Sequence, residues 1–116
     1  MSIPNLTPTS ISTAVSPTGQ RLKDKICIVT GAASGLGRAI SLAFAAQGAR
    51  LVLCADLKST PRSEFEAEEA GKPTHEVICQ RYGENKGVFV QTNVTKGLEV
   101  EALVQEAVRL GGRLDV

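Results

Sequence analysis

The feature that most limits how this chain can fold is a glycine-rich turn placed directly between a short apolar run and a helical pattern. The run, Ile-Cys-Ile-Val at residues 26–29, fits a strand buried on both faces, as in a parallel sheet. The turn reads Thr-Gly-Ala-Ala-Ser-Gly-Leu-Gly at residues 30–37. Gly48 then stands where a left-handed C-cap would end a helix. The apolar face of that helix is expected to contain Leu36, Ile40, Ala43, Phe44 and Gln47.

The same alternation continues along the chain. A second apolar run at residues 51–55 ends at Asp56, and a third predicted strand covers residues 87–92. A helix with Val100, Leu103, Val104 and Ala107 on one face is expected to stop at the glycine pair 111–112. Residues 114–116 look like a fourth strand just beginning. This order predicts an α/β fold with a parallel sheet and flanking helices, truncated at the start of the fourth strand.

Two segments interrupt this pattern. Residues 1–22 are rich in Ser, Thr and Pro, and we expect them to form a flexible tail before a domain at residues 23–116. The connection at residues 57–86 is longer and more polar than a crossover needs, and its breakers predict two short helices. The first would cover residues 64–70, and the second residues 76–81 with Thr74 as its N-cap.

Composition excludes several classes of protein. A net charge of +1 predicts no nucleic-acid partner and no anionic membrane partner, and no apolar run approaches the roughly 20 residues that cross a bilayer. Three cysteines without a C-x-x-C pair and a single histidine predict no metal site. Small buried thiols suit a reducing compartment, so we expect a cytoplasmic protein. Organelle targeting by the Ser-rich tail is the alternative.

The position of the glycine turn, between strand and helix, gives it a phosphate-binding mechanism. Gly31 would let the chain turn tightly, Gly35 would let backbone N–H groups approach a pyrophosphate, and Gly37 would let the helix pack closely on the sheet. The unpaired N–H groups at the start of the helix would then meet the anion. No G-x-x-x-x-G-K-[ST] pattern is present, so a Walker-type triphosphate site is not expected.

Residues 25–40 closely resemble the opening of the classical short-chain dehydrogenases/reductases, whose cofactor motif is T-G-x-x-x-G-x-G. The resemblance extends over about residues 22–116. It implies the N-terminal half of a Rossmann-type, doubly wound parallel sheet. It also implies NAD(H) or NADP(H) as cofactor, and hydride transfer between an alcohol and a ketone. The cofactor-binding residues that it implies in the turn are Thr30, Gly31, Ser34, Gly35, Leu36 and Gly37.

Asp56 stands where a carboxylate accepts hydrogen bonds from the adenosine ribose of NAD. NADP-preferring relatives commonly carry a basic residue where this chain has Ser34 or Leu57, so NAD is the expected cofactor and NADP the alternative. Asn93 and Val94 occupy the place where the family usually has Asp-Val beside the adenine. Asn93 would offer a neutral acceptor there, unless it only starts the following loop.

We predict no catalytic residue within these 116 residues. The family's catalytic tyrosine and lysine follow the fourth strand. Tyr82 and Lys86 form a literal Tyr-x-x-x-Lys, but Gly83 and Asn85 place them in a turn before the third strand.

Two other readings stay open at this point. One is a truncated, catalytically inactive dinucleotide-binding module or an incomplete gene product. The other is an adenosylmethionine-binding methyltransferase, which shares the strand, the glycine turn and the acidic residue. An alcohol or ketone substrate is implied only for a chain completed by further residues. The sequence gives no prediction of oligomeric state.

Overall fold

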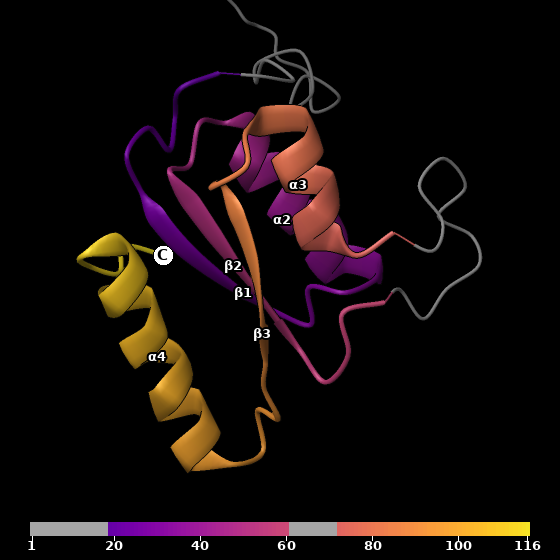
Figure 1. Ribbon diagram of the computed structural model, residues 1–116, viewed down its shortest axis with the longest axis vertical. Helices are drawn as coiled ribbons and strands as arrows, with labels where there is room; N and C mark the ends of the chain where they lie inside the picture. The colour runs from indigo at the N-terminus through magenta and orange to yellow at the C-terminus, as the bar shows by residue number, and fades with distance from the viewer. Residues whose placement is uncertain (1–18, 61–71) are drawn as a thin grey trace, which may run out of the picture.

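A computed structural model describes residues 19–60 and 72–116, which form a parallel sheet with helices on both faces (Figure 1). The elements in chain order are β1 (Ile26–Thr30), α2 (Gly35–Ala46), β2 (Leu51–Asp56), α3 (Thr74–Tyr82), β3 (Gly87–Gln91) and α4 (Gly97–Gly111). Strand β2 lies between β1 and β3, and the register pairs Val29 with Cys54 and Cys54 with Phe89. The predicted α/β architecture is therefore confirmed.

Alternate residues of the strands bury two separate cores. Helices α2 and α3 cover one face of the sheet, and α4 covers the other (Figure 1). The first core contains Cys27, Val29, Ala45, Val52, Cys54 and Ile78. The second contains Ile26, Leu51, Leu53, Ala55, Leu103 and Ala107. Because both faces of β2 are buried, its continuous apolar run is the pattern that a central parallel strand requires.

The buried face of α2 differs from the predicted one. Leu36 is 77% exposed and Ala43 is also exposed, whereas the fully buried positions are Arg38, Ser41 and Ala45. The apolar Ile40 and Phe44 are only partly buried and pack against the edge of the first core. The predicted end of the helix is confirmed, since Gln47 is the C-cap and Gly48 has a φ of +88°.

Helix α3 begins at Thr74, one residue earlier than a helix capped by Thr74 would begin. Its N-cap is Pro73, and Thr74 is its first residue, so the prediction that Thr74 caps the helix is wrong. The Thr74 hydroxyl instead donates a hydrogen bond to the carbonyl of Ala32, 42 residues away. The predicted helix at residues 64–70 lies outside the described residues.

One end of the described chain contacts helix α2, and the other contacts β1. Residues 1–18 of the predicted tail lie outside the described residues, but Gly19 and Leu22 donate backbone hydrogen bonds to Ala46 and Gln47 at the end of α2. At the other end, Val116 donates to the carbonyl of Ile26 at 3.1 Å and accepts from the N–H of Ile28 at 2.9 Å. These two bonds have the parallel pattern and place Val116 beside the edge of β1, but residues 114–116 are not a strand of the three-stranded sheet, so the fourth strand stays a prediction.

No helix within residues 19–60 and 72–116 has the length and apolar character needed to cross a bilayer.

Replacing Leu103 by alanine tests whether α4 holds the second core together. Leu103 is 2% exposed, so its truncation removes buried surface and leaves a cavity. We expect Leu103→Ala to lower the free energy of unfolding by about 2–5 kcal/mol, measured by urea denaturation. Val104→Ala, at the next position and 39% exposed, is the matched control and should change it far less. Equal losses in the two variants would contradict this packing.

Candidate functional site

The glycine turn lies at the carboxyl edge of the sheet, between the end of β1 and the start of α2. Gly31 and Gly35 have φ values of +66° and +59°, which side-chain-bearing residues rarely adopt. A Cβ on either residue would meet no atom within 4 Å, so the space above the turn is open. A Cβ on Gly37 would lie 2.0 Å from the carbonyl oxygen of Gly31. The three glycines therefore differ in role: two shape an accessible turn, and Gly37 permits the close approach of α2.

Asp56 faces this turn from the end of β2. One carboxylate oxygen accepts the backbone N–H of Ala33 at 3.0 Å, and the other accepts the N–H of Leu57 at 2.7 Å. A carboxylate offers about four acceptor positions, so these two bonds leave capacity for a ligand hydroxyl. The side chain that the sequence singled out for a ribose thus also holds the turn.

The start of α2 presents a positive electrostatic end to the same edge. Its N-cap, Ser34, makes no side-chain capping bond, and the first turn of the helix contains no acidic residue. By contrast, the first turns of α3 and α4 contain Glu76 and Glu99. The first N–H groups of a helix have no acceptor within it, so this end of α2 suits an anion.

Asn93 and Val94 follow β3 at the same edge, but Asn93 is engaged within its own loop. Its side-chain oxygen accepts both the N–H and the hydroxyl of Thr95, at 3.0 and 2.6 Å. These two bonds use both lone pairs of the amide oxygen, as in a turn-starting asparagine. An adenine amino group would have to displace one of them. Val94 is 56% exposed and offers an apolar surface beside this loop.

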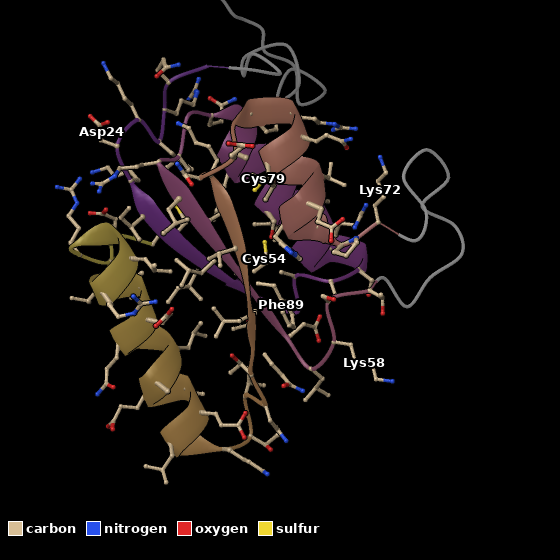
Figure 2. All side chains as sticks on the ribbon, viewed as in Figure 1. Asp24, Cys54, Lys58, Lys72, Cys79 and Phe89 are labelled. Atoms are coloured by element: carbon tan, nitrogen blue, oxygen red, sulfur yellow. The ribbon has the colours of Figure 1, made fainter. Side chains whose placement is uncertain are left out.

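Two adjoining hollows mark this edge of the sheet, and Leu57 lines both. One is lined by Ala33, Asp56, Leu57, Lys58 and Thr60. The other is lined by Leu57, Gln91, Asn93, Lys96 and Glu99. Lys58 lies in the loop after β2, near the lower end of the sheet in Figure 2. The structure thus brings the turn, the acidic strand end and the residues after β3 to one edge, where parallel α/β sheets bind ligands.

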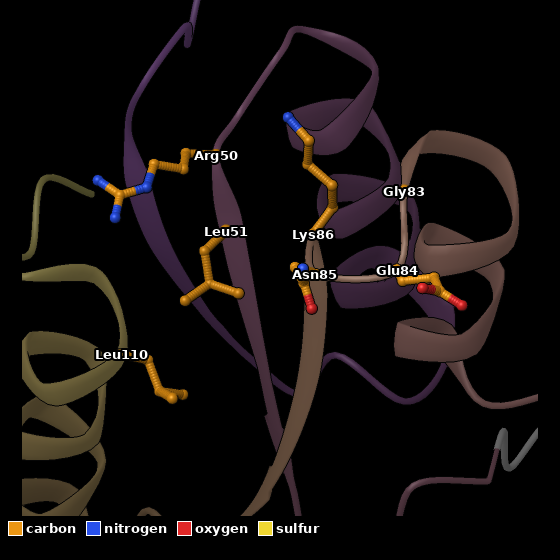
Figure 3. Close-up of a pocket in the computed structure, with 7 residues that line it drawn as sticks. All are labelled: Arg50, Leu51, Gly83, Glu84, Asn85, Lys86 and Leu110. Carbon is orange, nitrogen blue, oxygen red and sulfur yellow. The ribbon is translucent and has the colours of Figure 1, made fainter.

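A further hollow lies at the opposite, amino edge of the sheet. It is lined by Arg50, Leu51, Gly83, Glu84, Asn85, Lys86 and Leu110. Its two basic side chains point in different directions (Figure 3). Tyr82 ends α3 and Lys86 immediately precedes β3, so this literal Tyr-x-x-x-Lys lies at the edge away from the glycine turn.

The thiols contribute no reactive group to the carboxyl edge. Burial raises the pKa of Cys27 to about 11 and that of Cys54 to about 12, so both stay protonated at neutral pH. Cys79 is half-buried, and its single S–H proton lies within reach of the carbonyls of Glu84 and Gly87. Among the described residues, no group of three or more His, Cys, Asp or Glu side chains could hold a metal ion.

Sequence reasoning missed two residues that contact the turn, Arg38 and Thr74. Arg38 is 4% exposed and donates to the Thr74 hydroxyl, which in turn bonds the turn carbonyl of Ala32. No local pattern reveals a contact across 42 residues. The available signal is the spacing of Arg38, Ser41 and Ala45, which places an arginine on a buried helical stripe.

The family model described as short chain dehydrogenase matches residues 25–116. The chain belongs to the short-chain dehydrogenase family. The matched part starts one residue before β1 and includes the whole described site.

Relatives agree with that assignment. The chain is 34% identical over 95 residues to the short chain dehydrogenase/reductase astE of Aspergillus oryzae, covering 82% of this chain and 32% of that protein. It is 40% identical over 95 residues to 3-hydroxyacyl-CoA dehydrogenase type-2 of Drosophila melanogaster, covering 82% and 31%. A solved short chain dehydrogenase from Mycobacterium smegmatis has a TM-score of 0.66 and 28% identity, covering 86% of this chain and 38% of that one. The chain thus spans about a third of the length of these relatives.

Replacing Gly37 by alanine tests the close contact at the start of α2. The added Cβ would collide with a backbone oxygen, so the turn or the helix must shift. We expect Gly37→Ala to lower the melting temperature measured by circular dichroism. Gly97→Ala is the control, because Gly97 also begins a helix and its added Cβ would meet nothing within 4 Å. That variant should be neutral or gain up to about 1 kcal/mol from helix propensity. Equal stability of Gly37→Ala and the wild type would contradict the contact.

Proposed function

We propose that this chain binds the ADP-ribose part of a nicotinamide dinucleotide at the carboxyl edge of its sheet, as the cofactor-binding half of an NAD(P)-dependent oxidoreductase. The observation that carries this proposal is the Asp56–Ala33 bond. It joins the end of β2 to an open glycine turn, so that a carboxylate and the start of α2 face one crevice. Membership of the short-chain dehydrogenase family supports the same cofactor class.

In this proposal, each cofactor-binding residue has one task. Thr30, Gly31, Ser34, Gly35, Leu36 and Gly37 present backbone groups of the turn and the first helical turn to the diphosphate. Asp56 accepts a ribose hydroxyl with its remaining acceptor capacity, and Leu57 and Val94 offer apolar surface to the adenine. Asn93 shapes the loop beneath it, since its side chain is bonded to Thr95. The nicotinamide of such a cofactor supplies hydride chemistry when it is bound.

We favour NAD over NADP because a ribose phosphate would face the negative charge of Asp56. Two like charges 4 Å apart repel by about 4 kcal/mol at an effective dielectric constant near 20. The observation that favours the alternative, NADP, is Lys58, which lines the same hollow.

For a protein that continues to the full length of these relatives, we propose hydride transfer between an alcohol and a ketone. The Drosophila relative is named a 3-hydroxyacyl-CoA dehydrogenase, which is consistent with this reaction class. Tyr82 and Lys86 take no part in it, because both lie at the amino edge of the sheet. The second candidate is a module that binds the dinucleotide without transferring hydride. If this second candidate is right, the 116 residues alone oxidise no alcohol.

Calorimetric titration of the chain with NAD, NADP and ADP-ribose tests the proposal. We expect NAD and ADP-ribose to bind with similar heats, because both carry the diphosphate and the adenosine ribose that the described residues contact in this proposal. Absence of heat with every ligand would refute the function. Alcohol-dependent formation of NADH by the 116 residues would refute the second candidate.

Substituting Asp56 by asparagine tests cofactor preference. Asn keeps an oxygen that can accept the Ala33 N–H, but it removes the negative charge from the crevice. We expect Asp56→Asn to shift the ratio of NAD to NADP affinity toward NADP by at least about tenfold, because charge repulsion of this size exceeds 1.4 kcal/mol. Asp24→Asn is the control, since it removes the same charge just before β1, at the amino edge (Figure 2). An unchanged ratio in Asp56→Asn would contradict the role given to this carboxylate.

A further inference from the structure

Arg38 is a buried cation close to the glycine turn. It lies in the first half of α2, on the face of the helix that packs against the rest of the protein. The residue is 4% exposed, and its guanidinium donates to the carbonyl of Lys72 at 2.8 Å and to the hydroxyl of Thr74 at 3.1 Å. Burying a charge costs free energy, and well-packed apolar side chains often serve a core as well or better. Packing alone therefore does not account for an arginine at this position.

The contacts of Arg38 continue into the turn through one hydroxyl. Thr74 is 1% exposed, and its hydroxyl donates to the carbonyl of Ala32 at 2.6 Å. The guanidinium can only donate and the Ala32 carbonyl can only accept, so the Thr74 hydroxyl accepts from Arg38 with a lone pair and donates its single proton to Ala32. The result is a directed chain of hydrogen bonds from the guanidinium, through Thr74, to a backbone carbonyl of the turn. Charge-assisted bonds in a buried setting are stronger than neutral ones in water.

This chain of bonds holds one side of a peptide group whose other side is held by Asp56. In the peptide that joins Ala32 to Ala33, the carbonyl accepts from Thr74, and the N–H donates to the Asp56 carboxylate at 3.0 Å. The N–H of Ala32 also donates to the carbonyl of Ala55 in β2, at 3.1 Å. The turn is thus fixed from α3 on one side and from β2 on the other. These bonds orient the other backbone groups of the turn in the ligand-free chain.

We propose that Arg38 and Thr74 are positioning residues for diphosphate binding. They act through Ala32 by orienting the turn that leads into α2, and they need not touch the ligand. This inference rests on the proposed function, because it assigns the oriented turn to a diphosphate. A preorganised site avoids the cost of ordering its loop on binding, so loss of the chain of bonds should weaken affinity.

The first test replaces Thr74 by valine, which keeps the side-chain shape and removes the hydroxyl, and by serine, which keeps the hydroxyl. In the full chain we expect Thr74→Val to weaken binding of ADP-ribose about tenfold, as for loss of one buried hydrogen bond, and Thr74→Ser to restore it. Affinity for adenosine, which lacks the diphosphate, should stay the same in both variants, as measured by NMR titration. Equal ADP-ribose affinities of the valine and serine variants would overturn the inference, as would a parallel loss of adenosine binding.

Ile78→Val separates positioning from general destabilisation. Ile78 is fully buried on the same helix, and losing one methyl group lowers stability without touching the bonds to Ala32. We expect ADP-ribose to bind Ile78→Val as it binds the wild type. Weakening equal to that of Thr74→Val would overturn the inference.

Amide hydrogen exchange of the ligand-free chain provides a readout that does not depend on binding. The N–H of Ala33 should exchange at least about tenfold faster in Thr74→Val than in Thr74→Ser, because the carbonyl on the other side of its peptide is no longer held. Equal rates would overturn the positioning role. If the wild type binds no ADP-ribose, the proposed function fails and this inference fails with it. If the wild type binds and the variants do not differ, only this inference fails.

Discussion

The closest backbone approach at the site lies between the first turn of α2 and the turn that precedes it. Because Gly37 has no Cβ, its backbone can lie against the carbonyl of Gly31, where any side chain would collide. That approach directs the start of the helix at the carboxyl edge of the sheet, and the buried positions of α2 are Arg38, Ser41 and Ala45. The position of the start of α2 therefore depends on the absence of a side chain at Gly37.

The turn is also fixed by polar contacts from elements that are distant in sequence. Asp56 reaches it from β2 and Thr74 from α3, and they hold opposite sides of the same peptide group. Asp56 therefore combines two tasks, since it stabilises the turn and places a negative charge beside the crevice. In the proposed function, the same contact would support both binding by the turn and discrimination at the adenosine ribose.

Sequence predicted the strands well because β1, β2 and β3 are apolar runs bounded by clear breakers, and it predicted the end of α4 from two glycines. The buried face of α2 could not be predicted from apolar periodicity, because the side chains that face the sheet include Arg38 and Ser41. Thr74 was misassigned for a similar reason: a threonine before a helix reads as a local cap, but its hydroxyl bonds a residue 42 positions away. The glycines of the turn could be predicted from the family motif, and Asp56 from its position at the end of the second apolar run. The residues that orient the turn carry no such mark.

The end of the described chain makes one side of the sheet sensitive to acid. The carboxylate of Asp115 accepts the N–H of Ile26 at 2.9 Å and pairs with Arg113 at 3.0 Å. The bond from Ile26 holds the pKa of Asp115 below its ordinary value, so these contacts persist at neutral pH and are lost only as the pH falls through that lowered pKa. Protonation would weaken this side-chain contact, but the backbone hydrogen bonds that Asp115 and Val116 make with Ile26 and Ile28 do not titrate. Acid would therefore loosen the attachment of these residues to the edge of β1, which the backbone bonds alone would then hold.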